Sequence, residues 1–188
     1  SIRSSATSNV NKALEEYRFN DAASEIYHFI WHEFCDWYIE MAKSDIKNPE
    51  LEMSVLRCLL YTLDNSLRLL HPFMPYVTEE IWQKIPHVRR DKKEIQESIM
   101  ISEYPESLSV DHKAEEDMSY IIDAVLGIRT IRGELNVPPS AALNVSIKSY
   151  SRKAEEILKE NIQYLKKLSN SADIKIGMEI SKPEGSAT

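Results

Sequence analysis

The chain has 188 residues, 43% of them apolar, enough for one domain, or a domain with a small appendage, around a buried core. Its 23 basic and 30 acidic residues are mixed along the chain and give a net charge of −7, which argues against general disorder and against a dedicated nucleic-acid binder. No apolar run approaches the ~20 residues that span a membrane, and the first residues lack the apolar stretch of a signal peptide. Two cysteines, Cys35 and Cys58, cannot form a disulfide framework and favour a reducing cytoplasm, and the missing initial Met suggests an excised piece of a longer protein.

Helices are expected wherever the chain runs without proline or glycine. The first glycine is Gly127, and prolines are sparse before it, so the uninterrupted stretches can form long helices. Asn20 and Asp21 offer a cap for the helix predicted to begin at 22, and acidic residues in its first turns favour the helix predicted to begin at 76. The predicted helices span residues 8–17, 22–43, 50–71, 76–84 and 111–135. Residues 98–105 are predicted to form a short extended connection.

After Pro138 and Pro139 the hydrophobic period changes from helix to strand. Leu143, Val145 and Ile147 alternate with polar residues, which predicts a half-buried strand. A basic helix is predicted at 152–168, followed by a second strand at 174–180. The fold class is therefore mainly α: a helical bundle (1–139), a small strand–helix–strand unit (140–181) and a flexible tail (182–188).

Half of the 16 aromatic residues of the chain lie between Tyr17 and Tyr38, six of them in the second helix. At 100° per residue it has a broad apolar face that predicts core packing, made by Ala23, Ile26, Tyr27, Ile30, Phe34, Trp37, Tyr38 and Met41. The opposite side carries Glu25, His28, His32, Asp36 and Lys43, with Cys35 at its margin and the apolar Ile39 among them. The spacing of His28, His32 and Asp36 could present three metal ligands, but a solvated polar face is the simpler interpretation. The two cysteines are interpreted as small hydrophobic residues.

No motif for catalysis is present. Four well-separated glycines cannot build a phosphate-binding loop or a nucleophile elbow, and no carboxylate pair has a recognisable acid–base arrangement. A modest basic zone occurs between residues 124 and 176, with nine basic and five acidic residues, and it permits an RNA partner.

Three long runs resemble one family. Residues 29–43, FIWHEFCDWYIEMAK, resemble the FxWxxFCDWYIExxK run of valyl-tRNA synthetases. Residues 69–82, LLHPFMPYVTEEIW, are similar to the LLHPFMPFxTEEIW run of these enzymes, and residues 128–139, IRTIRGELNVPP, to their IRxxRxExNxPP run. The resemblance covers about residues 8–180, in the order and with the spacing of the family.

The resemblance implies a part of such an enzyme, namely the anticodon-binding helical bundle of class Ia synthetases and the α/β piece after it. The family uses ATP with magnesium to join valine to its tRNA, but the HIGH-type and KMSKS-type motifs and the editing domain are absent from this sequence. We therefore expect no activity and no cofactor or metal in this chain alone. The implied partners are tRNA-Val and the catalytic and editing domains of the same polypeptide, in a cytoplasmic monomer without membrane contact. The chain begins downstream of the family's KxWNAxRF-type helix and stops before its coiled-coil arm.

The resemblance also implies candidate tRNA-binding residues. Cys35 and Ile39 match family positions that face unstacked anticodon bases, and Lys43, further along the helix, can reach a phosphate. Arg129 and Arg132 can contact the tRNA stem or, alternatively, stabilise the end of their helix. A structural role is expected for residues in the core and in the turn between helices: Trp37, Tyr38, His71, Pro72 and Pro75. Two other classes stay open, a free-standing RNA-binding module and a helical protein-interaction domain.

Overall fold

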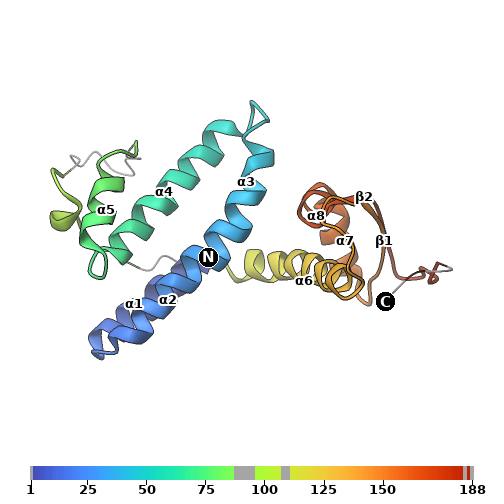
Figure 1. The fold of residues 1–188 in the computed structure, drawn as a ribbon, viewed down its shortest axis with the longest axis horizontal. Helices are drawn as coiled ribbons and strands as arrows, with labels where there is room; N and C mark the ends of the chain where they lie inside the picture. Colours follow the sequence, from blue (N-terminus) through green and yellow to red (C-terminus); the bar gives the residue numbers. More distant parts are fainter. Residues whose placement is uncertain (1, 87–95, 107–110, 184–185, 187–188) are drawn as a thin grey trace. The chain divides into compact units, whose positions relative to one another are not determined.

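The computed structural model describes residues 2–86, 96–106, 111–183 and 186, in two compact units, 1–110 and 111–188 (Figure 1). Both units are mainly helical, and the second contains a small parallel sheet, which confirms the predicted fold class. The helices of the first unit are α1 (Ile2–Glu15), α2 (Phe19–His28), η1 (Phe29–Ile39), α3 (Glu40–Asp45), α4 (Glu52–Leu70), α5 (Pro75–Trp82) and η2 (Ile99–Ile101). The second unit contains α6 (His112–Glu134), β1 (Leu143–Lys148), α7 (Arg152–Glu160), α8 (Ile162–Ser169) and β2 (Ser171–Gly177).

The predicted helix at 22–43 is a longer helix whose middle is wound differently. Between α2 and α3, the 11 residues of η1 form a π-helix, in which backbone hydrogen bonds join residues five apart instead of four. A π-helix has more residues per turn than an α-helix, so faces drawn at 100° per residue do not hold from Phe29 onward. The sequence pattern gives no sign of this change.

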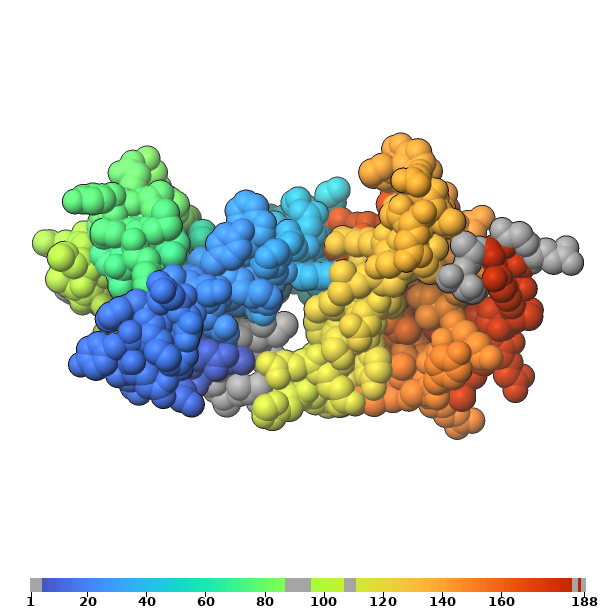
Figure 2. All heavy atoms as spheres, turned by 60° about the horizontal axis from the view of Figure 1, so that its bottom comes forward, coloured from blue at the N-terminus to red at the C-terminus, as the bar shows by residue number. Residues whose placement is uncertain are grey.

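The α1–α2 hairpin forms the first part of the core. α1 begins at Ile2, earlier than the predicted 8–17 helix, and the chain reverses after it at Tyr17, whose φ of 56° is left-handed. The two helices lie side by side (Figures 1 and 2). Their apolar side chains meet α4 in one buried cluster of Val10, Ala13, Ala22, Ile26 and Leu69.

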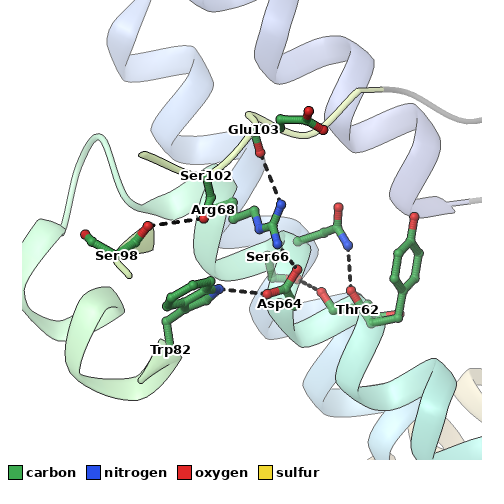
Figure 3. A network of polar contacts seen from close by, with 10 residues as sticks. Thr62, Asp64, Ser66, Arg68, Trp82, Ser98, Ser102 and Glu103 are labelled. Atoms are coloured by element: carbon green, nitrogen blue, oxygen red, sulfur yellow. Dashed lines mark hydrogen bonds and ion pairs between the residues drawn. The ribbon is translucent and has the colours of Figure 1, made fainter. Parts of the chain in front are cut away.

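A second part of the core joins α4, α5 and η2 around Trp82. This indole is only 2% exposed and packs with Leu67 and Ile99. Ile99 belongs to a short 3₁₀ turn, which lies near the start of the segment predicted as extended at 98–105. Figure 3 shows the polar network beside it: Trp82 Nε1 donates to Asp64 Oδ1 at 2.7 Å, and Arg68 Nη2 lies 2.9 Å from Asp64 Oδ2. Arg68 Nη1 also donates to the carbonyl oxygen of Glu103 at 3.3 Å. The buried carboxylate thus links α4, α5 and the segment after η2.

The turn between α4 and α5 is held by the LLHPFMP run. His71 Nδ1 lies 2.7 Å from Thr78 Oγ1, and that hydroxyl also donates to the carbonyl oxygen of Met74. Pro75 begins α5, where a missing backbone N–H costs no helical hydrogen bond. The contacts of His71 and the position of Pro75 agree with the structural role expected for them in the turn between helices.

The second unit contains the predicted strand–helix–strand arrangement. β1 pairs with β2 in parallel, and the connecting chain forms two helices, because the predicted helix at 152–168 is interrupted at Asn161. The alternation predicts the second strand at 174–180, but β2 ends at Gly177, so Met178 and Ile180 lie outside it. Side chains from α6, α7, α8 and β2 fill the core: Ile121, Val125, Ile128, Ala154, Ile157, Leu158, Leu165, Leu168 and Ile174.

α6 begins at a well-formed cap and belongs to this second unit. The Asp111 carboxylate accepts a hydrogen bond from the Ala114 N–H, which satisfies one free donor of the first turn. Packing groups α6 with the strands, whereas the sequence pattern places its residues in a bundle ending at 139. Of the tail predicted at 182–188, residues 184, 185, 187 and 188 lie outside the described residues. Within the described ranges, no helix is long and apolar enough to cross a membrane.

Candidate nucleic-acid interface

Cys35 and Ile39 lie in the π-helix and are both half-buried. They pack at the edge of a cluster formed by Ala6, Phe29 and Phe34. The α-helical angles put Ile39 among exposed polar residues, and the structure corrects this, because the wider π winding turns its side chain toward the cluster. Ile39 therefore offers only part of its surface to a ligand.

The two cysteines have different surroundings. Burial, and then the Asp36 carboxylate, raise the pKa of the Cys35 thiol, so it stays protonated at neutral pH and acts as a small apolar group. Cys58 is exposed on α4 and hydrogen-bonds the Tyr38 hydroxyl. Burial, followed by this hydrogen bond, raises the pKa of Tyr38. The hydrophobic interpretation thus describes Cys35 better than Cys58.

Two aromatic side chains upstream of Cys35 face solvent. Tyr27 is 60% exposed and Trp31 is 56% exposed, and their rings are nearly parallel, 5° apart, with centroids 6.3 Å apart. The His32 ring stands edge-on to Tyr27 at 6.1 Å. The sequence pattern assigns Tyr27 to the buried face, which is wrong for this side chain, although it leaves Trp31 off that face. The result is an exposed pair of flat apolar rings.

These rings continue the row of predicted site residues. Tyr27, Trp31, Cys35, Ile39 and Lys43 follow one another at intervals of four residues, slightly more than one turn in α2 and α3 and slightly less than one turn in the π-helix η1, so successive side chains lie close together. We call these five residues the α2–α3 strip. Lys43, at its end, is exposed and forms an ion pair with Glu40. An exposed pair of this kind contributes little stability, so a phosphate can replace the carboxylate.

The histidines beside the strip pair with carboxylates. His28 Nδ1 lies 3.5 Å from Glu33 Oε1, and His32 Nδ1 lies 3.5 Å from Asp36 Oδ2. The two imidazole centroids are 5.2 Å apart. Among the residues that the structure describes, no group of three or more His, Cys, Asp or Glu side chains is arranged to hold a metal ion.

Arg129 and Arg132, by contrast, contact carbonyl oxygens near the end of another helix. Arg129 Nε and Nη2 donate to the carbonyl oxygen of Leu168, at the end of α8, at 3.3 and 3.0 Å. Arg132 Nη2 donates to Ser169 and Asn170, both at 3.1 Å, while its Nη1 donates to Pro138 and Ala141 at 2.9 and 2.7 Å. The guanidinium of Arg132 thus joins the loop after α6 to the end of α8.

Replacing Arg132 separates its structural role from a purely electrostatic one. We expect Arg132→Lys to destabilise the second unit by about 2 kcal/mol, because an ammonium keeps the charge but cannot hold four carbonyl oxygens in two directions. Native-state hydrogen exchange at the β1 and β2 amides measures this loss. Unchanged protection in the lysine variant would show that charge alone matters at this position.

Comparison with known families assigns the chain to a class of helical tRNA-reading domains. Residues 2–147 match the model described as the anticodon-binding domain of tRNA ligase, from α1 into β1. This chain belongs to that family.

The curated relatives share one name. The chain is 42% identical over 180 residues to the valine–tRNA ligase of Syntrophotalea carbinolica, covering 94% of this chain and 20% of the relative. It is 41% identical over 189 residues to that of Geobacter sulfurreducens (97% and 20%) and 42% identical over 181 residues to that of Thermotoga maritima (95% and 19%). The chain thus spans about one fifth of the length of the relatives it matches.

Proposed function

We propose that this chain binds the anticodon region of a tRNA through the α2–α3 strip, as part of a valine–tRNA ligase. The observation that carries the proposal is the strip itself: an exposed aromatic pair, two half-buried apolar side chains and a terminal lysine, within residues that match the anticodon-binding family. Sequence-specific RNA recognition targets unstacked bases, and a flat apolar surface beside a cation suits both parts of a nucleotide.

Each residue of the strip has a distinct role in this proposal. The rings of Tyr27 and Trp31 present a surface on which a base can stack. Cys35, protonated and half-buried, and Ile39 contribute apolar contacts to a neighbouring base. Lys43 exchanges the Glu40 carboxylate for a phosphate. Arg129 and Arg132 contribute positive charge near the tRNA stem while their N–H groups hold carbonyl oxygens.

The remaining parts of the proposal concern the longer protein. Valine activation with ATP and magnesium, and editing, belong to domains of the same polypeptide outside this chain. The whole polypeptide acts on tRNA-Val in the cytoplasm and is a monomer. The relatives that carry the name valine–tRNA ligase are about five times longer than this chain, which leaves room for such domains.

Ile39→Glu in the full-length enzyme tests the proposal. We expect kcat/KM for tRNA to fall by a factor corresponding to roughly 1–3 kcal/mol, because a carboxylate removes an apolar base contact and repels phosphate. Valine-dependent ATP–pyrophosphate exchange, which needs no tRNA, should stay unchanged. The two steady-state assays on one preparation measure both quantities.

Met53→Glu is the matched control, because Met53 is exposed in the first turn of α4 and is not part of the strip. It should leave both reactions unchanged. An equal loss of both reactions in the Ile39 variant would indicate misfolding. An unchanged kcat/KM for tRNA in the Ile39 variant would reject the strip as the binding site. If the chain is instead a helical protein-interaction domain, its NMR spectrum should also stay unchanged when tRNA is added.

A further inference from the structure

The second unit contains a cleft that the proposed anticodon site does not use. It has a volume of about 500 Å³, within the range of ligand pockets. α6 contributes Ile128, Ile131 and Leu135 to its walls, and the exposed edge of the β1 region contributes Leu143 and Val145. The floor is therefore apolar.

The charge of this cleft differs from that of the chain. Arg132, Lys148 and Lys182 line it, and none of its described lining residues is Asp or Glu, although these make up 30 of the 188 residues. All four bonds made by the terminal nitrogens of Arg132 go to carbonyl oxygens, so this residue supplies charge from a fixed position. Lys148, at the end of β1, carries charge that can meet a ligand directly. The described lining of the cleft therefore carries a net positive charge.

An aromatic ring stands at the carboxyl end of β1, beside one of these lysines. Tyr150 is 87% exposed, and Lys148 Nζ lies 5.7 Å from the centroid of its ring. The backbone between them is fixed, because the Ser149 N–H donates to the carbonyl oxygen of Gly177 and the Ser149 hydroxyl donates to that of Ser151. The residues after β2 line the same cleft. In open parallel sheets, ligands bind beyond the carboxyl ends of the strands, which is where this ring and these lysines lie.

From this arrangement we propose that the cleft binds a segment of single-stranded RNA. A base stacks on Tyr150, and the adjacent phosphate lies against Lys148, while the apolar floor receives a second base or its sugar. An exposed ring next to a cation, at a groove whose described part is lined by basic and apolar residues, is a combination that holds single strands without reading their sequence. An acidic peptide would use the lysines and the edge of β1 but would gain little from the ring. Only the choice of RNA as the ligand rests on the proposed function, since the site is separate.

The test uses the 188-residue chain and a fluorescein-labelled 12-nucleotide oligouridine, with binding followed by anisotropy at 50 mM salt. We expect Tyr150→Ala to weaken binding about tenfold, since stacking of one base is lost, and Tyr150→Phe to bind like the unaltered chain. Lys148→Gln should weaken binding and reduce the slope of log K against log salt by about 0.7, the value for one phosphate of a single strand.

Lys113→Gln is the matched control for charge. Lys113 lies in the first turn of α6, outside the cleft, and its loss should leave binding unchanged. The effects of Tyr150→Ala and Lys148→Gln on oligouridine binding report on the cleft and need no aminoacylation assay, so failure here is distinguishable from failure of the proposed function. Undetectable binding, an unchanged affinity of the Tyr150→Ala chain, or equal competition by polyglutamate of the same charge would overturn the proposal, the last in favour of an acidic peptide.

Discussion

Asp64→Ala should destabilise the first unit by about 3 kcal/mol, the largest effect that we expect from a single substitution. The Asp64 carboxylate is buried and satisfies both the Trp82 indole and the Arg68 guanidinium (Figure 3). Removing the carboxylate leaves the Trp82 indole without this acceptor and leaves Arg68 with the carbonyl oxygen of Glu103 in place of its ion pair, which costs more than the pair contributes. Urea denaturation followed by tryptophan fluorescence measures the loss. Trp31, Trp37 and Trp82, the three tryptophans of the sequence, belong to the first unit, so the signal reports on that unit.

Two variants give this prediction its controls. Trp82→Phe removes one hydrogen bond to a charged acceptor and should cost about 1–2 kcal/mol. Glu80→Ala breaks the exposed ion pair between Glu80 and Lys84, which lie four residues apart, and should change stability by less than about 0.5 kcal/mol. Equal effects of Asp64→Ala and Glu80→Ala would contradict a structural role for the buried carboxylate.

The isolated chain should bind tRNA weakly, with a Kd on the order of 10⁻⁴–10⁻⁶ M at physiological salt, the range of non-specific contacts. Its net charge of −7 opposes RNA, and the guanidinium groups of Arg129 and Arg132 already hold carbonyl oxygens. In the proposed longer enzyme, further contacts would raise the effective concentration of each weak contact, and the isolated chain does not have this gain. With about three phosphates neutralised, affinity should fall roughly 40-fold between 50 and 200 mM salt.

Fluorescence anisotropy in a salt series measures this dependence. A tRNA with a swapped anticodon is the control, and it should bind about as well as tRNA-Val. Nanomolar affinity with strong discrimination between the two would contradict the prediction, because the chain alone would then hold a complete recognition surface.

The sequence by itself determined the order and type of most elements. Helices end near Pro72 and Pro138, where proline removes a donor and restricts the preceding residue, and the alternation from Leu143 to Ile147 marks β1. These signals are local, so they can be read without knowing the fold. The family could also be identified, since the runs at 29–43, 69–82 and 128–139 are long and specific.

The tertiary structure alone decided how the side chains are used. Nothing in the 3.6-residue period predicts the π winding that turns Ile39 toward Phe29 and Phe34, or the exposure of Tyr27 in the preceding α2. Arg132 meets carbonyl oxygens up to 38 residues away, and Asp64 meets an indole 18 residues away. Such partners are brought together by packing, whereas periodicity reports only which residues share a face of one element. The physical reason is therefore distance along the chain: local pattern selects helix or strand, and long-range contacts decide burial, pairing and the surface left for a ligand.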